Sequence, residues 1–303
     1  MKNVYNMDIE KLKKAGQIAA KVREEVNSYC EEGKDYLSVI NFCEERIIEL
    51  EGEIAWVQIS PTTTAAHFCP TKNNNPVCEK GDLLKIDIGV HIDGYIADTA
   101  TTVLIPGGED EELKLKLIET SKRALEEAGK LIKPGVTLRE LGIAQMTEAK
   151  KSGFTTVTNL SGHTIDRWRV HGGLSIPTFD NSSTFELKEG DLVAIEPFIT
   201  DGEGKIHEEG IASVFMQARD ANVRSQQGRK ILTYVRERNG LPFSTQELEQ
   251  KFDHATTILG LRELKKNKII QEYPPLTEIS KRPVAQFEHT FIVGYGCITK
   301  LEE

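Results

Sequence analysis

The spacing of hydrophobic residues predicts a pair of helices followed by a β-hairpin. Apolar positions recur at helical spacing over residues 7–27 and 37–50, and the turn signal Glu32-Gly33-Lys34 separates the two helices. An extended segment is expected at 54–59, followed by a loop rich in Thr, Asn and Pro. Residues 83–90 and 96–104 then alternate like two strands around the turn signal Asp93-Gly94, which predicts a hairpin.

A similar order of elements recurs further along the chain. Helices are expected at 109–130 and 138–151, a strand at 155–159, and further strands at 192–200 and 211–217. The stretch Gly33-Lys34-Asp35-Tyr36 before one helix parallels Gly135-Val136-Thr137-Leu138 before another. This weak internal repeat predicts two similar halves that face each other.

Residues 218–281 interrupt the repeat with a helical pattern. Gly240-Leu241-Pro242 breaks the chain there, and Ser244-Thr245-Gln246-Glu247 has the form of a capping box. Strand character returns over 284–293. We therefore expect one main domain built from residues 1–217 and 282–303, with residues 218–281 as a helical insertion subdomain.

Composition narrows the class of protein. Hydrophobic residues make up 39% and charged residues 28% of the 303 residues, which is typical of a soluble globular protein. The chain has no apolar run long enough for a membrane span and no apolar signal-peptide core at its start, so we expect a cytoplasmic location and no membrane partner. A net charge of −9 argues against DNA binding. Five cysteines without a C-x-x-C pair indicate free thiols rather than a zinc ribbon or a disulfide framework.

Two aspartates lie within the predicted hairpin. If Asp93-Gly94 is a two-residue turn, Gly89 faces Asp98, and Asp98 is then the diagonal neighbour of Asp87 on the same side of the sheet. Diagonal neighbours lie about 7–8 Å apart at the backbone. Asp98 alone would be interpreted as a hydrogen-bonded turn carboxylate. The pair favours a metal, because two buried like charges require either protonation or a cation between them.

Three further residues interrupt apolar or glycine-rich segments. Glu196 and Glu288 each lie within a predicted strand, and His163 lies in the glycine-flanked loop Ser161-Gly162-His163-Thr164. Either glutamate alone would be interpreted as a strand-edge residue facing water. Four carboxylates and one imidazole together form an oxygen-rich ligand set, which suits two hard or borderline divalent ions better than one structural zinc.

These segments resemble the type 2 methionine aminopeptidases, a branch of the pita-bread metallopeptidases. The resemblance extends over essentially the whole chain. It implies an α/β (α+β) pita-bread fold with two pseudo-symmetric helix-strand halves around a curved antiparallel sheet. The matching stretches are Asp87-Ile88-Gly89, Asp98-Thr99, Ser161-Gly162-His163, Glu196-Pro197-Phe198 and Gln286-Phe287-Glu288-His289-Thr290. By this resemblance the metal ligands are Asp87, Asp98, His163, Glu196 and Glu288.

Two more histidines fit the same family. Ala65-Ala66-His67 and Val170-His171-Gly172-Gly173 resemble its two substrate-side histidine segments, although His67 alone would be interpreted as a loop histidine. The helical segment at 218–281 matches the insertion that separates type 2 from type 1 enzymes. The chain lacks the charged N-terminal extension of eukaryotic type 2 enzymes, so we expect the short archaeal-type form. Phe68-Cys69-Pro70 departs from the Tyr-Thr-Pro that is commoner in the family.

The resemblance implies a metal-dependent aminopeptidase that removes the initiator methionine of nascent proteins when the second residue is small. Two divalent ions, of Mn, Fe, Co or Zn, would activate a bridging water, with Glu196 as general base and then acid. His171 and His67 would bind substrate and polarise the scissile carbonyl. The partners implied are N-terminal peptides of nascent proteins. Contact with the ribosome would follow from that function, and a monomer is the default expectation.

Two other functions are compatible with the same fold. An X-Pro peptidase, either a prolidase or an aminopeptidase P, would use the same ligands, but such enzymes usually carry a large domain ahead of the first aspartate. A non-catalytic RNA- or protein-binding relative is the second alternative. Relatives of that kind have lost ligands, whereas all five candidates are present here, and the acidic net charge also counts against RNA binding.

Overall fold

The computed structural model describes residues 7–301, and within them the chain folds into seven helices and seventeen strands. The helices are α1 (Ile9–Tyr29), α2 (Tyr36–Glu49), α3 (Glu111–Lys130), α4 (Leu138–Lys151), α5 (Gln226–Glu237), α6 (Thr245–Lys251) and α7 (His254–Lys266). The strands are β1 (Glu53–Pro61), β2 (Thr64–Ala66), β3 (Leu83–Ile92), β4 (Tyr95–Leu104), β5 (Thr155–Thr156), β6 (Gly162–Thr164), β7 (Ser175–Ile176), β8 (Leu192–Ile195), β9 (Phe198–Thr200), β10 (Ile206–Glu208), β11 (Val214–Gln217), β12 (Phe243–Ser244), β13 (Ile270–Tyr273), β14 (Leu276–Glu278), β15 (Val284–Gln286), β16 (His289–Ile292) and β17 (Gly296–Cys297). No helix in this part of the chain is long and apolar enough to cross a bilayer.

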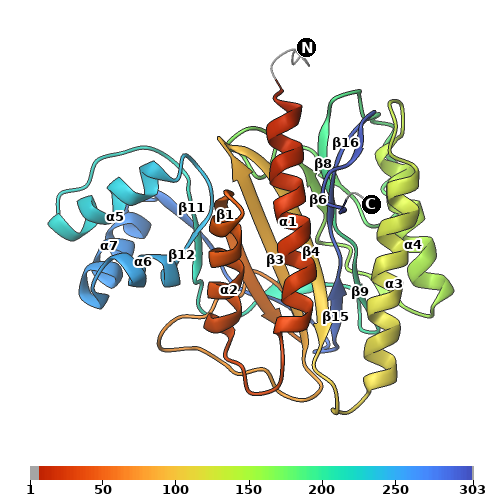
Figure 1. Cartoon of the computed structure of the whole chain (residues 1–303), viewed down its shortest axis with the longest axis horizontal. Helices are drawn as coiled ribbons and strands as arrows, with labels where there is room; N and C mark the ends of the chain where they lie inside the picture. The colour runs from red at the N-terminus through yellow and green to blue at the C-terminus, as the bar shows by residue number, and fades with distance from the viewer. Residues whose placement is uncertain (1–6, 302–303) are drawn as a thin grey trace.

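The first half of the molecule packs α1 and α2 against the antiparallel sheet β1-β3-β4 (Figure 1). Each helix begins at an aspartate cap, since the Asp8 carboxylate accepts from the Lys11 amide and the Asp35 carboxylate from the Ser38 amide. The apolar faces of both helices and the side chains of the sheet beneath them form the largest hydrophobic core of the described residues.

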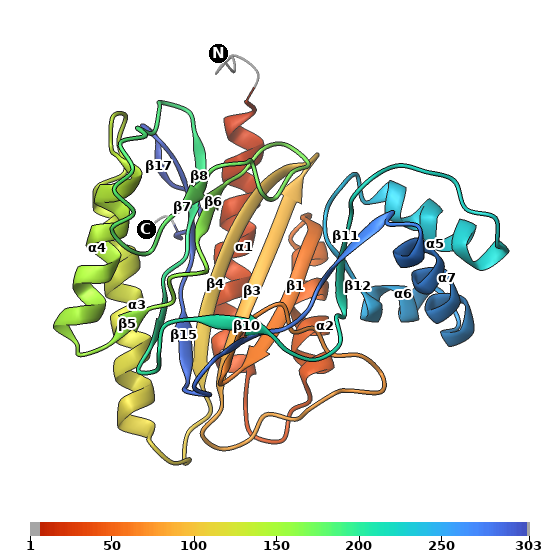
Figure 2. The same ribbon diagram turned by 180° about the vertical axis from the view of Figure 1, so that it is seen from behind.

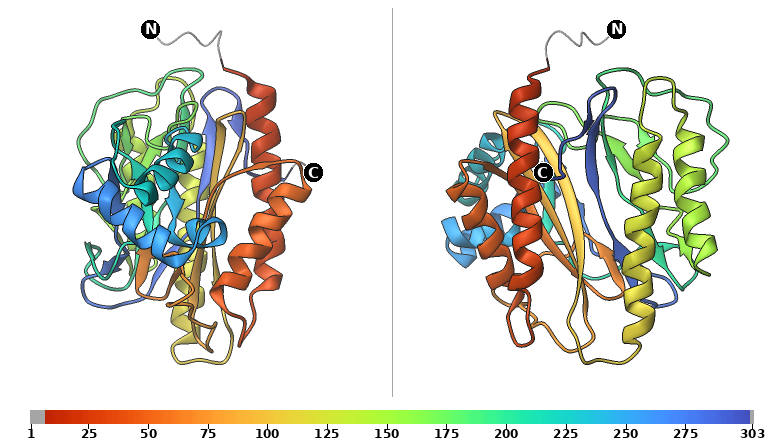
Figure 3. Two further views of the ribbon diagram at one scale, coloured as in Figure 1. Left: turned by 90° about the vertical axis from the view of Figure 1, so that its left-hand side faces the viewer. Right: turned by 45° about the vertical axis from the view of Figure 1, so that its right-hand side comes forward.

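The second half repeats this arrangement. Helices α3 and α4 cover β15, β9 and β5 and lie on the same side of the sheet as α1 and α2, as Figures 1 and 3 show. Asp35 and Thr137 occupy equivalent places as the caps of α2 and α4, and Gly33 and Gly135 both precede them with positive φ. The internal repeat in the sequence is therefore confirmed.

The two halves are joined along β4, which runs beside β15 and β16. Ala100 forms an antiparallel bridge with Glu288. On either side, the Thr102 hydroxyl donates to the Gln286 carbonyl at 2.7 Å, and the Thr290 hydroxyl donates to the Asp98 carbonyl at 2.7 Å. These contacts make a continuous curved surface whose helix-free side is seen in Figure 2.

Two strands expected to be continuous are broken in the structure. The 192–200 segment divides into β8 and β9 at Glu196 and Pro197, because proline has no backbone N–H to donate to a neighbouring strand. The 284–293 segment divides into β15, which pairs with β9, and β16, which pairs with β8. Glu196 and Glu288 occupy these two breaks. Their interruption of apolar runs therefore marks a change of pairing rather than an exposed edge.

Residues 218–281 contain the three helices α5, α6 and α7, which surround a second hydrophobic core that also includes Ala212 and Phe215 of the preceding segment. The capping box at Ser244 and Glu247 is confirmed at the start of α6. Three short strands, β12 to β14, also lie in this segment, and β12 and β13 pair with β11 of the preceding segment. In Figure 2 the helices stand to one side of the two halves, beyond β1.

Candidate metal centre

The hairpin β3-β4 carries the two aspartates on one face. Gly89 pairs with Asp98 and Asp87 pairs with Ala100, so Asp98 is the diagonal neighbour of Asp87. This register is the one that the Asp93-Gly94 turn predicts, and Asp93 and Gly94 both have the positive φ of such a turn. The two carboxylates therefore lie on the side of the sheet away from α1.

The second half brings three more side chains to the same place. His163 lies on β6, which pairs with β8, and its Nε2 is 3.6 Å from Asp98 Oδ2 and 3.7 Å from Glu196 Oε1. Ligand atoms of Asp98, His163 and Glu288 all lie within 4.8 Å of one another. Asp87 is in contact with Asp98 across the hairpin. All five side chains thus form one cluster, with two from the first half and three from the second.

Burial and mutual repulsion govern the charge of this cluster. Asp98 is 3% exposed and Glu288 2%. Burial raises the pKa of all four carboxyls, and neighbouring carboxylates raise the pKa further for Asp98, Glu196 and Glu288. Burial lowers the pKa of His163 to about 3, so its imidazole is neutral at pH 7.

The donor atoms fit divalent cations. Asp98 Oδ1 and Glu288 Oε1 are buried and have no hydrogen-bond partner, which is costly for a carboxylate unless a cation takes the lone pairs. A neutral imidazole is the form of histidine that binds metals. Four carboxylates and one neutral histidine match the oxygen-rich set expected for hard or borderline divalent ions.

Two side chains that the sequence analysis did not single out hold these carboxylates. The Trp56 indole donates to Asp87 Oδ1 at 2.8 Å. The Gln286 amide nitrogen lies 3.4 Å from Glu196 Oε2 and 3.5 Å from Glu288 Oε2. Gln286 precedes Glu288 by two residues and the strand period of two could have indicated it, whereas Trp56 is identified only by the pairing of β1 with β3.

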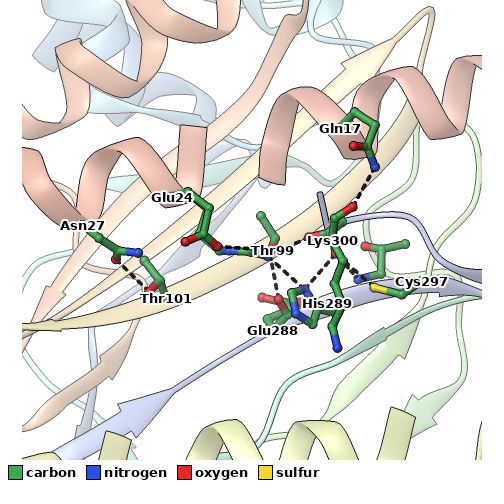
Figure 4. Close-up of polar contacts among 12 residues, drawn as sticks. Gln17, Glu24, Asn27, Thr99, Thr101, Glu288, His289, Cys297 and Lys300 are labelled. Carbon is green, nitrogen blue, oxygen red and sulfur yellow. Dashed lines mark hydrogen bonds and ion pairs between the residues drawn. The ribbon is translucent and has the colours of Figure 1, made fainter. Parts of the chain in front are cut away.

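A buried hydrogen-bond network supports the cluster from the helix side of the sheet (Figure 4). Arg23 of α1 donates to the Thr99 hydroxyl at 2.7 Å and to the Thr299 carbonyl at 2.8 Å. The Thr99 hydroxyl in turn donates to the Glu288 carbonyl at 2.7 Å. Thr99 follows Asp98 and therefore points to the opposite face, where its hydroxyl links α1 to the backbone carbonyl of Glu288.

The remaining two predicted residues, His67 and His171, lie beside the cluster. The His171 ring is 4.7 Å from the His163 ring, and the His67 ring is 5.5 Å from Tyr273. Burial and the nearby His171 lower the pKa of His67 to about 4. Burial, and to a smaller extent the positive charge of Arg169, lower the pKa of His171. His67 has a φ of +66°, and its Nδ1 is buried without a partner. A positive φ is uncommon in a residue other than glycine, and a buried polar atom without a partner is energetically costly.

All seven predicted residues line a single cavity of about 370 Å³. Its other walls include Trp56, Phe198, Met216 and Tyr273, which give it an apolar part next to the carboxylates. The four other histidines of the chain lie outside this lining: His91, His207, His254 and His289. The cavity therefore combines acidic, imidazole and apolar groups within a volume typical of small-ligand sites.

The chain is similar to known proteins over nearly its whole length. The model of metallopeptidase family M24 matches residues 10–293. A methionine aminopeptidase from Pyrococcus horikoshii is 42% identical over 300 residues, which cover 98% of this chain and 100% of that protein.

Solved structures agree on the fold. The crystal structure of a methionine aminopeptidase from Thermotoga maritima superposes with a TM-score of 0.69 at 21% identity, covering 97% of this chain and 96% of the other. A thermophilic Arx1 superposes with a TM-score of 0.84 at 18% identity, covering 97% and 91%. At these identities the matches show a common fold, and the expected pita-bread architecture is confirmed.

Proposed function

The chain belongs to metallopeptidase family M24, and from that membership we propose that it acts as a methionine aminopeptidase on the N-terminal peptides of nascent proteins. Two relatives named as methionine aminopeptidases match this chain over 100% and 97% of their own length. The observation that carries the proposal is the convergence of five donor side chains and two neutral imidazoles on one cavity.

Asp87, Asp98, His163, Glu196 and Glu288 would hold two divalent cations. The unpartnered oxygens of Asp98 and Glu288 support this assignment, as does the absence of a lysine or arginine among the described residues that line the cavity. When bound, the cations would supply Lewis-acid chemistry, which lowers the pKa of water and stabilises negative charge on the reacting carbonyl.

Glu196 is the proposed proton carrier. Gln286 lies against its Oε2, which leaves Oε1 facing the cluster to take a proton from the attacking water and return it to the leaving amine. In the metal-free cluster, burial and then repulsion from Asp87 raise the pKa of Glu196.

His67 and His171 are the proposed donors to the substrate carbonyl. Both imidazoles are neutral at pH 7, because burial lowers their pKa, and a neutral imidazole still has one N–H to donate. That hydrogen bond would strengthen as negative charge develops on the carbonyl oxygen. The apolar walls at Phe198 and Met216 offer a place for the methionine side chain.

Metal-free protein reconstituted separately with Mn²⁺, Fe²⁺, Co²⁺ or Zn²⁺ would test the proposal with Met-Ala-Ser, Met-Lys and Ala-Pro peptides. We expect methionine release from Met-Ala-Ser only. The Glu196→Gln variant should lower kcat at least about 100-fold, because general acid–base catalysis usually contributes that much or more. Glu208→Gln, on exposed β10, is the matched control and should keep full activity.

The other outcomes separate the alternatives. Cleavage confined to Ala-Pro would make the protein an X-Pro peptidase. Folded protein that binds cations but cleaves none of the peptides would refute the aminopeptidase assignment and favour a binding role.

A further inference from the structure

The indole ring of Trp56, which lines the cavity, lies against Gly89 of the neighbouring strand. Trp56 on β1 pairs directly with Gly89 on β3. A Cβ built on Gly89 would lie only 2.4–2.5 Å from three atoms of the Trp56 ring, so any larger residue would displace the indole. Gly89 does not have a positive φ, and glycine is thus required there for space rather than for backbone conformation.

A β-bulge turns Trp56 toward the site. Ile54 pairs with Val90, but Trp56 pairs with Gly89, so one extra residue, Ala55, is accommodated on β1. Without this bulge Trp56 would pair with Ile88 and point to the helix side of the sheet. With it, Trp56 shares a face with Asp87, Gly89 and Asp98.

The indole nitrogen reaches one oxygen of a proposed metal ligand. Trp56 Nε1 donates to Asp87 Oδ1 at 2.8 Å, and Trp56 is only 5% exposed. A buried, directional donor fixes the rotation of the carboxylate and leaves Oδ2 for another partner. Partners of this kind orient metal ligands, and their loss usually costs about 10–100-fold in metal affinity or activity.

We propose that Trp56 is a positioning residue that orients Asp87 for cation binding, and that Gly89 and the bulge at Ala55 exist to seat its indole. This inference rests on the proposed function, because it takes Asp87 as a metal ligand. It assigns Trp56 no contact with the reacting atoms, and its effect passes through the Asp87 carboxylate.

Trp56→Phe tests the hydrogen bond while keeping an aromatic ring over Gly89. Trp168→Phe is the matched control, because Trp168 also packs on a glycine of the hairpin, Gly94, but lies outside the cavity. Calorimetric titration of metal-free protein with Co²⁺ should show at least about 10-fold weaker binding at one site in Trp56→Phe only. The visible spectrum of the Co²⁺ form should change with it, whereas the far-ultraviolet circular dichroism of the metal-free variant should match that of the control and show that the variant folds.

Co²⁺ affinity and spectrum equal to those of Trp168→Phe would overturn the inference and leave the proposed function intact. Failure of the parent protein itself to bind cations would instead refute the proposed metal centre. The two failures are therefore distinguishable.

A second measurement keeps Trp56 in place. In the Trp168→Phe protein, labelled with ¹⁵N, the single remaining indole N–H should exchange slowly with water and shift when Zn²⁺ is added. Gly89→Ala should abolish both properties by displacing the ring and should weaken Co²⁺ binding as Trp56→Phe does. If the indole N–H exchanges rapidly and its chemical shift does not change when Zn²⁺ is added, the proposal is contradicted. This outcome does not depend on any substitution in the site.

Discussion

His67 combines three unusual properties of a single residue: a left-handed backbone, a buried Nδ1 without a partner, and a lowered pKa. The left-handed backbone and the unpartnered Nδ1 are both unfavourable in a residue that only fills space. A role as donor to the transition state accounts for all three, because substrate would supply the missing partner.

His67→Ala should therefore lower kcat on Met-Ala-Ser about 100–1,000-fold, the usual cost of removing one oxyanion donor. Metal content should be unchanged, since His67 is not among the five proposed ligands. Steady-state kinetics with parallel metal analysis measures both. His207→Ala, on β10 and half exposed, serves as the control. Unchanged kcat in His67→Ala would remove His67 from the catalytic groups.

Arg23 is a buried residue of α1 whose hydrogen bonds support the site from the helix side of the sheet. It is 6% exposed and donates to Thr99 and Thr299, with His289 Nδ1 2.9 Å away. Arg23→Met would keep much of the side-chain volume but leave these acceptors buried and unsatisfied. We expect a loss of about 2–4 kcal/mol in the free energy of unfolding of the metal-free protein.

Urea unfolding measures this loss, with Arg224→Met on the exposed surface as the control. A loss below about 0.5 kcal/mol, the usual range of surface substitutions, would show that water or rearranged side chains replace the arginine.

At the scale of elements, local sequence determines most of the main-chain structure. The helices α1 to α4 begin and end within two residues of the expected positions, because their caps and apolar spacing are local signals. The hairpin register follows from the Asp93-Gly94 turn alone. The break at Glu196 was not predicted although Pro197 is a local signal for it, and the break at Glu288 was not predicted because it depends on a change of partner strand that is distant in sequence.

The contact between α2 and α6 contains a titratable group. Burial, followed by repulsion from Glu247, raises the pKa of Glu44 from 4.5 to about 7, while Arg238 opposes the shift. A carboxyl with a raised pKa stabilises the fold fully below about 4.5, and this contribution is lost as pH rises through about 7. The parent should therefore become less stable between pH 5 and pH 8.

Glu44→Gln should remove that loss and be more stable than the parent at pH 8, by on the order of 1 kcal/mol after allowance for partial solvent exposure. At pH 5 the two proteins should differ little. Chemical unfolding at both pH values, with the exposed neighbour Glu45→Gln as control, measures the effect. Equal pH dependence in Glu44→Gln and the parent would refute the burial argument.

At the scale of the whole molecule, the site exists only where the two halves meet. The Asp87–Asp98 pair follows from one hairpin and could be predicted from its turn. The approach of His163, Glu196 and Glu288 required either the family resemblance or the structure, because no local signal places β6 or β16 near β4. The position of Trp56 at the site could not be predicted for the same reason, since it depends on a bulge in the pairing of β1 with β3.

Because the cluster draws ligands from both halves, cation binding should stabilise the fold as a whole. Without cations, burial and then repulsion from neighbouring carboxylates raise the pKa of Asp98, Glu196 and Glu288. A cation at 100 times its Kd adds about 2.7 kcal/mol to the free energy of unfolding if it binds only the folded state. The thermal midpoint should accordingly rise by several degrees on metal addition and fall again with chelator. The Glu288→Gln variant, which lacks one carboxylate of the second half, should lose most of this rise. If the thermal midpoint of the parent protein does not change when metal is added, the cluster does not join the two halves through cations.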